Sequence, residues 1–198
     1  MRKVYILLAA FGLILGACAT RIPSAQETLD PTAFPITFAA GGLAGTQERY
    51  VRAVDPSNLV AYVGMWDARE GDYRRAYIQA YRYPEGTYGN TRPDFEEYLP
   101  SFEPALRNKP LVFGPVQLLI GHDGNIYYQT FTFENASCVA FFEHILLRET
   151  TPSHVLGDGE VNGYYCAPRG EKLTDADARD FLSSLRHRDA RKRTGKVS

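Results

Sequence analysis

The stretch VQLLIGHDGNIYYQTFTF, residues 116–133, decides the fold. Two apolar and aromatic runs flank Asp123-Gly124, a dipeptide typical of a two-residue type I′ turn, because both central residues of that turn need positive φ. The sequence therefore predicts an antiparallel hairpin. Its register places three pairs on one face: Ile120 with Tyr127, Leu118 with Gln129, and Val116 with Phe131. The opposite face is more polar, so we expect the face of these three pairs to lie against the core.

Patterns of period two predict further strands on either side of this hairpin. Residues 73–83 alternate tyrosines with small or apolar residues, and the apolar and aromatic segment 59–66 precedes them. Residues 137–147 are almost wholly apolar, which fits a buried strand or a short helix. Asp158-Gly159 resembles a second hairpin turn that leads into a strand over residues 161–166.

Two helical segments complete the predicted fold. The last element is a helix after Thr174, which can cap it together with Asp177. Its apolar residues share one face: Phe181, Leu182 and Leu185. Residues 92–108 also have helical spacing, but Pro100 and Pro104 interrupt it, so we expect one or two short turns over a sheet edge. Together these elements predict an α+β fold, an antiparallel β-sheet with hairpins and with helices packed on one side, including the C-terminal helix.

The first residues have the layout of a secretory signal, with Arg2 and Lys3 before a charge-free run over residues 4–16. As a helix, that run would reach only about 20 Å, short of the roughly 30 Å hydrocarbon core of a bilayer. Leu15-Gly16-Ala17-Cys18 follows directly and resembles the lipobox of bacterial lipoproteins. The resemblance implies cleavage before Cys18, a diacylglycerol group on its sulfur, and an acyl chain such as palmitate on its amine. An ordinary signal peptide that leaves a free thiol is the alternative.

The lipid on Cys18 would then be the whole membrane attachment, since two or more acyl chains hold a protein stably. Lipoproteins of this kind tend to stay in the inner membrane when Asp follows the acylated cysteine. Here Ala19 follows it. The resemblance therefore implies a lipid-anchored protein of the cell outer membrane that faces the periplasm.

With Cys18 lipidated, Cys138 and Cys166 are left as a pair in an oxidising compartment, which indicates a disulfide. It would close a loop of about 29 residues, and the loss of chain entropy in the unfolded state would then contribute roughly 3 to 4 kcal/mol. Two buried free thiols and a redox pair are the alternatives. No Cys-x-x-Cys spacing supports the redox pair.

Four segments are predicted along the chain: a cleaved signal peptide over residues 1–17, a flexible tether over 18–35, a single domain over 36–186, and a basic disordered tail over 187–198. Without Arg2 and Lys3, twenty basic residues stand against 23 acidic ones, so the net charge of the mature chain is near −3. This charge balance argues against nucleic acid as a partner. The basic tail is a candidate contact for anionic lipid head groups or acidic polymers.

The sequence contains no linear signature of catalysis or metal binding. Neither His-Glu-x-x-His nor Gly-x-Ser-x-Gly occurs, and the glycines near residue 42 lack the lysine of a P-loop. We therefore expect no catalytic residue, no metal and no cofactor. An envelope hydrolase is an alternative that would need His122, Asp123 and His154 to meet from separate loops.

Tyrosines are the other candidates for a site. Four of them would form one row along a strand: Tyr73, Tyr77, Tyr81 and Tyr83. Such a row is a candidate surface for a sugar, a peptide or a partner protein. The competing interpretation is that the rings pack the sheet while their hydroxyls reach its rim.

The sequence favours a non-enzymatic lipoprotein with a binding or structural role towards an envelope protein or an anionic polymer. A periplasmic carrier of a small ligand is the second hypothesis, and it would need the tyrosine row to face an aromatic-lined cavity. The envelope hydrolase is the third.

Overall fold

The computed structural model describes residues 25–39, 43–68, 74–89, 94–103, 106–150 and 157–191. The predicted signal peptide, the lipobox with Cys18 and the first part of the predicted tether lie outside the described residues. The same holds for Tyr73, for His154 and for residues 192–198 of the predicted tail.

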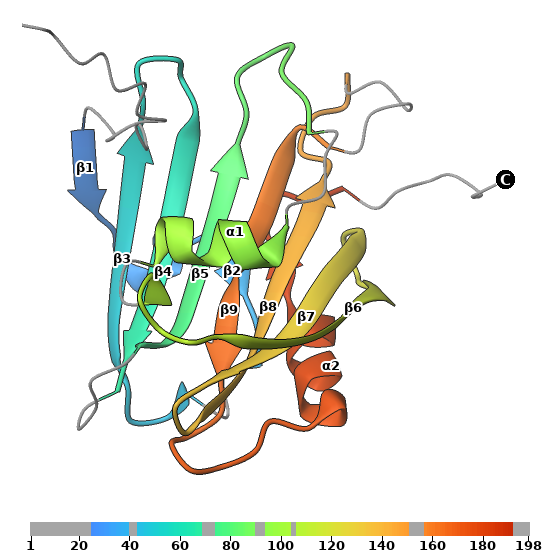
Figure 1. Ribbon diagram of the computed structural model, residues 1–198. Coiled ribbons are helices and arrows are strands. Elements are labelled where there is room, and N and C mark those ends of the chain that lie inside the picture. The colour runs from blue at the N-terminus through green and yellow to red at the C-terminus, as the bar shows by residue number, and fades with distance from the viewer. Residues whose placement is uncertain are drawn as a thin grey trace, which may run out of the picture.

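Eight antiparallel strands form one twisted sheet in the order β1-β3-β4-β5-β9-β8-β7-β6 (Figure 1). The strands are β1 (Ala25–Thr28), β3 (Gln47–Val54), β4 (Val60–Asp67), β5 (Arg74–Arg82), β6 (Val112–Ile120), β7 (Asn125–Phe133), β8 (Ala136–Ile145) and β9 (Gly159–Cys166). After β5 the chain crosses the sheet with α1 (Phe95–Phe102), enters the far edge as β6, and returns through two hairpin partners to β9 beside β5. The predicted antiparallel sheet is confirmed, and β1 and β6 are its two edges.

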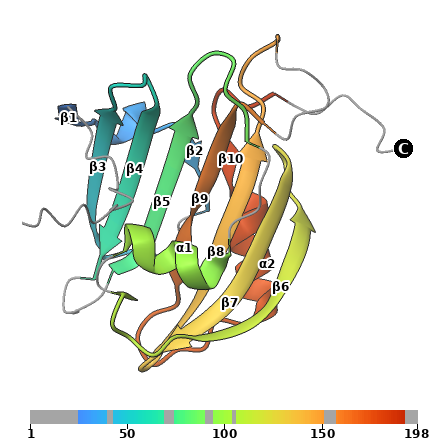
Figure 2. The same cartoon turned by 45° about the horizontal axis from the view of Figure 1, so that its top comes forward.

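The two helices lie on opposite faces of the sheet, so the prediction of helices on one side is wrong (Figures 1 and 2). The C-terminal helix α2 (Asp175–Ser184) buries Phe181 and Leu182 in one core, here called the α2 core. Helix α1 buries Phe95 and Leu99 in a second core on the other face, the α1 core. The physical reason lies in the central strands, which carry apolar side chains on both faces and need a cover on each.

Strand β8 shows this requirement most clearly. The apolar run over residues 137–147, which fits a strand or a helix, forms a strand. Nine of its ten residues are buried. Phe141 packs in the α2 core and Phe142 in the α1 core, because successive side chains of a strand point to opposite faces. The chain from Asp158 does not form the second tight hairpin turn, because the buried Asp158 carboxylate instead accepts the backbone N–H groups of Leu147 and Arg148.

The hairpin predicted over residues 116–133 is present, but its register differs from the prediction by two residues. Ile120 lies opposite Asn125 and Leu118 opposite Tyr127, and the turn is centred on His122-Asp123. The N–H of Gly121 donates to the carbonyl of Gly124 at 2.8 Å, so these two glycines flank the turn. A Cβ on Gly124 would stand 2.8 Å from the carbonyl oxygen of His144, which explains why glycine follows Asp123 without lying in the turn.

The predicted core face of the first hairpin strand is also wrong. A slip of two residues keeps each side chain on its face, and on β7 that face is covered, with Phe131 1% exposed. On β6, however, the same face is open to solvent, because β6 is the last strand of the sheet and lies beyond α1 (Figure 2). The position of β6 at the edge of the sheet, and not its alternation of apolar residues, therefore determines whether this face is buried.

The predicted C-terminal helix is confirmed, including its cap. The side chain of Thr174 accepts the N–H of Asp177 at 3.2 Å, and the Asp177 carboxylate accepts the N–H of Thr174 at 3.0 Å. The predicted short turns over residues 92–108 are instead one eight-residue helix, α1, capped by Asp94 and continuous through Pro100.

Both ends of the described chain are more ordered than the sequence predicts. From Ala25 on, the predicted tether forms β1 and a 3₁₀ turn, η1 (Pro31–Ala33), and then buries Phe34. Strand β2 (Ile36–Thr37) pairs with β10 (Arg186–His187), so the predicted tail begins inside the fold. A backbone hydrogen bond holds the next part of the predicted tail to the fold: the N–H of Arg191 donates to the carbonyl of Leu146 at 2.8 Å.

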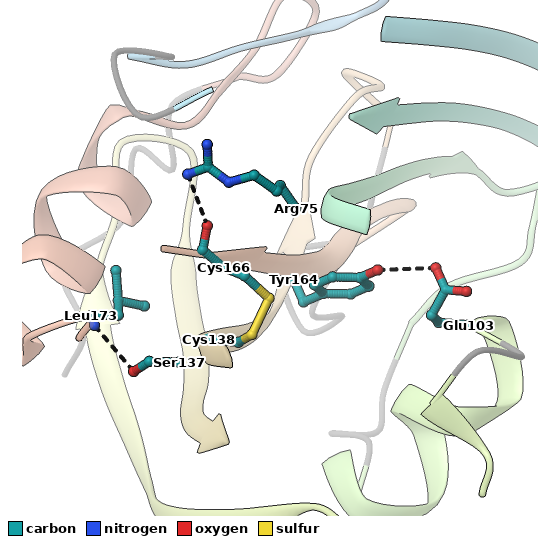
Figure 3. Close-up of a disulfide and its surroundings, with 7 residues drawn as sticks. All are labelled: Arg75, Glu103, Ser137, Cys138, Tyr164, Cys166 and Leu173. Atoms are coloured by element: carbon teal, nitrogen blue, oxygen red, sulfur yellow. Dashed lines mark hydrogen bonds between the residues drawn. A yellow bond between two sulfur atoms is a disulfide. The ribbon is translucent and has the colours of Figure 1, made fainter. Parts of the chain in front are cut away.

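The predicted disulfide between Cys138 and Cys166 is present, with an S–S distance of 2.02 Å (Figure 3). The two cysteines lie directly opposite each other on β8 and β9. Their residues are 1% and 0% exposed, so the bond is enclosed by the α1 core.

Replacing Cys138 and Cys166 together with alanine should lower the free energy of unfolding by about 2 to 5 kcal/mol, because the unfolded chain gains entropy. Urea denaturation measures this change. Dithiothreitol should lower the stability of the native chain by a similar amount and leave the double variant unaffected. Equal stability of the two chains without reductant would contradict a stabilising role for the bond.

Candidate binding surface

Two tyrosines of the row, Tyr77 and Tyr81, lie on the α1 face of β5, and Tyr83 follows the end of that strand. The Gln79 amide lies between two of them, because its Nε2 donates to the Tyr77 hydroxyl at 2.5 Å and its Oε1 accepts the Tyr81 hydroxyl at 2.9 Å. Burial is the main cause that raises the pKa of Tyr77 to about 12. Tyr77 therefore forms part of the packed interior of the protein, and Tyr81 lies half-buried beside it.

The third described tyrosine of the row contacts a half-buried carboxylate. Tyr83 donates its hydroxyl to Glu160 on β9, and the Asn162 amide donates to the same carboxylate at 2.9 Å. Tyr98 reaches it from α1 at 3.5 Å. Burial raises the pKa of Glu160, although each of these hydrogen bonds acts in the opposite direction. The contacts join helix to sheet, so the geometry supports packing as the role of this row more than display to a partner.

A second polar cluster lies near the disulfide (Figure 3). The Glu103 carboxylate, which follows α1, accepts the Tyr164 hydroxyl at 3.0 Å and the Arg74 guanidinium at 2.6 Å. These side chains line a cavity of about 100 Å³, which is below the size of ordinary ligand pockets. Each carboxylate of the cluster has a guanidinium partner, because Arg74 also forms an ion pair with Asp67 at 2.8 Å and Arg49 pairs with Asp67 at 2.7 Å.

The groups that a hydrolase would need are partly brought together. The Nδ1 atom of His122 lies 2.5 Å from Oδ1 of Asp123, whereas His154 lies outside the described residues. The other oxygen of Asp123 accepts the backbone N–H of His187 at 2.6 Å, so this carboxylate connects the hairpin to β10. Among the described residues no group of three or more His, Cys, Asp or Glu side chains is arranged to hold a metal ion.

A larger cavity of about 300 Å³ lies where β2 and β10 cover the end of the main sheet. It is lined by Tyr62, Tyr81, Arg82, His187, Asp189, Pro35 and Leu147. Only Tyr81 belongs to the predicted tyrosine row among these lining residues. The volume is at the lower end of the range for small-ligand pockets.

The outer edge of β6 is the surface that the fold leaves open. Among the described residues, four large apolar side chains are exposed, and all of them lie on β6: Val112 at 67%, Val116 at 43%, Leu118 at 50% and Ile120 at 84%. Natural sheets blunt their edges with charged residues, proline or short strands. Strand β6 is nine residues long and uncharged, and only its first half carries Pro115.

The backbone of the same residues is turned outward. Gly121 and Gly124 form a hydrogen-bonded pair, and such pairs alternate along an antiparallel ladder. Leu119 and Gln117 therefore bond to β7, whereas Val116, Leu118 and Ile120 direct their N–H and C=O groups to the open side. An extended segment that lies there would find a hydrogen-bonding ladder and an apolar stripe on the same three residues.

A groove adjoins the start of this edge. The register between β6 and β7 shifts between Phe113 and Val116, and the Gln129 side chain fills the gap by donating to the carbonyl of Gly114 at 2.7 Å. Beside this bulge an open, largely apolar groove of about 520 Å³ runs to Leu173, at the start of α2. The edge and the groove together form what we call the β6 surface.

The opposite edge of the sheet differs in each of these respects. Strand β1 has four residues, and its Glu27 forms an ion pair with Arg52 of β3 at 3.5 Å. This short, polar edge is protected in the usual way. The contrast identifies β6, and not sheet edges in general, as the candidate binding surface.

Comparisons with known proteins give no further guide, because no family model, no curated protein and no solved structure matches the chain. Within the described ranges, no helix has the length and apolar character needed to cross a membrane.

The buried imidazole at the β2–β10 sheet predicts a pH dependence. Burial lowers the pKa of His187 below 6.5, so the unfolded chain takes up a proton more readily than the folded one. The stability that neutral His187 contributes is present above about pH 6.5 and is lost as the pH falls through that value. The unfolding free energy of the native chain should therefore drop more steeply between pH 7.5 and 5.5 than that of His187→Gln. Parallel curves would contradict this role.

Proposed function

We propose that the chain is a lipid-anchored lipoprotein of the cell envelope, attached through Cys18 to the outer membrane and facing the periplasm. Its role in this proposal is non-enzymatic: it binds an envelope protein. The observation that carries the binding role is the β6 surface, where an uncharged nine-residue edge strand exposes Val116, Leu118 and Ile120. An edge of this kind recognises an extended polypeptide, because backbone groups supply affinity and the apolar stripe supplies preference.

The position of the anchor supports this role. The chain runs from Cys18 to β1 through only six residues, so an anchored Cys18 holds the β1 edge within about 24 Å of the membrane. Strand β6 is seven strand spacings away across the sheet, roughly 34 Å at 4.8 Å each. The anchored edge and the binding edge are therefore opposite edges of one sheet.

The carrier remains a second candidate because of the cavity of about 300 Å³ that includes Tyr62 and Arg82. The edge carries more weight, since an exposed apolar strand needs a cover whereas a small polar cavity can hold water.

Substitution of Cys18 tests the anchor. In cells that express the full precursor, Cys18→Ala should abolish incorporation of labelled palmitate and release the protein from the membrane fraction. Ala19→Ser should leave both unchanged, because it keeps the acylated residue. Membrane retention of Cys18→Ala would contradict attachment through the lipid.

Photocrosslinking in intact cells tests the binding edge. A benzoylphenylalanine at position 116 should give a discrete protein adduct, and Leu118→Lys in the same chain should remove it, because a buried ammonium has no partner on this stripe. The same probe at position 26 of β1 serves as the matched control and should give no discrete adduct. An adduct that survives Leu118→Lys, or none at position 116, would count against the β6 surface.

A further inference from the structure

We propose that the segment bound at β6 is the β6 strand of a second copy of this chain, so that two molecules join their sheets edge to edge. This inference rests on the proposed function, because it names the partner of the same surface. It commits to an isologous contact, in which each copy presents the same strand around a twofold axis.

The backbone favours a register centred on Leu118. Antiparallel pairing requires the two facing residues to direct their N–H and C=O groups at each other, and Val116, Leu118 and Ile120 all do so on the open side. With Leu118 opposite the second copy's Leu118, Val116 lies opposite Ile120 in both directions. All three outward-facing residues then pair with outward-facing residues.

The side chains agree with this register. Val116, Leu118 and Ile120 lie on one face of β6, and a twofold axis perpendicular to the sheet brings the two stripes together on that face. Each exposed apolar side chain would then have an apolar neighbour across the junction, which is the favourable cross-strand arrangement. The exposed fractions of these residues, from 43% to 84%, give the area that pairing would remove from water.

Charge selects the partner. Strand β6 has no charged residue over Val112–Ile120. The charges beside it on the other face, Asp175 and Arg179 of α2, form an ion pair with each other at 2.7 Å, so the apolar stripe offers nothing to balance a charged segment. A charged strand would lose hydration there without an ion pair. The other edge of the sheet, β1, carries Glu27 and is only four residues long, which argues against head-to-tail chains of molecules. The partner strand with the required length, register and lack of charge is β6 itself.

Proline does not obstruct the junction. Alternation along the strand turns the missing N–H of Pro115 towards β7, inside the bulge that begins after Phe113. In the register centred on Leu118, Pro115 lies opposite Gly121, at the end of the shared ladder. The bulge therefore limits the pairing to the second half of the strand.

The first experiment measures the mass of the full lipidated protein in detergent by analytical ultracentrifugation. We expect twice the chain mass, and a single chain mass for Leu118→Lys. Gln26→Lys on the β1 edge is the matched control and should keep the double mass. Circular dichroism and thermal unfolding show whether each variant is folded, and Ile120→Lys provides a second disruption at the most exposed position.

The second experiment tests the register with cysteines and a short bismaleimide. Leu118→Cys should crosslink to itself. Val116→Cys and Ile120→Cys should crosslink efficiently when the two variants are mixed, and several-fold less when each is alone. A parallel junction, or another register, would give a different set of efficient pairs and would overturn the inference.

The outcomes separate this inference from the proposed function. A single chain mass in detergent, together with a position-116 adduct to a different envelope protein, would overturn self-pairing while supporting the proposed function. A second possible result is a single chain mass with no adduct at position 116, together with Cys18→Ala protein that floats with phospholipid vesicles. If Leu118→Lys then abolishes this flotation, the apolar stripe binds the lipid surface, and both the inference and the proposed function are overturned. The double mass with the predicted crosslinks would support both.

Discussion

Burial on both faces of β8 is the constraint on which the rest of the structure depends. A strand whose Phe141 and Phe142 both need an apolar environment must lie in the middle of three layers. Helix α1 supplies one outer layer, and α2 with the small β2–β10 sheet supplies the other. On the α2 face the cover extends to β6, where Arg179 of α2 donates to Gln117 at 3.0 Å, whereas on the other face the sheet continues past α1 to β6. The open edge is thus a consequence of how the centre is covered.

The sequence patterns correctly predicted the elements that depend on interactions between residues close together in the chain. The capping pair Thr174 and Asp177 defined the start of α2, and the alternation over residues 73–83 predicted β5. The turn was misplaced because Asp-Gly matches a common turn, whereas here Asp123 turns inward to hold the N–H of His187, 64 residues away. No local pattern reports such a contact. Likewise, which helix covers which face of the sheet depends on the path of the chain after β5. The apolar pattern of a single strand carries no information about that path.

The candidate surface was missed for a related reason. Val116, Leu118 and Ile120 look like core residues, since an alternating apolar strand is usually half buried. Only their place at the end of the sheet makes them exposed, and strand order is not contained in the pattern of one strand. A signal was present in the absence of charge from Leu111 to Gly121, which is unusual for an edge. Conversely, composition alone predicted the tyrosine row as a surface, although Tyr77 accepts a hydrogen bond from Gln79 of its own strand and Tyr83 donates one to Glu160 of the adjacent β9.

The disulfide also fixes how two central strands are aligned. Cys138 and Cys166 face each other across β8 and β9, and a slip of one residue would turn one sulfur to the opposite face. Within the folded sheet, the two sulfurs can therefore meet only in this register. Once formed, the bond ties β8 to β9 at this pair, so a later slip of one central strand against the other would require the bond to break.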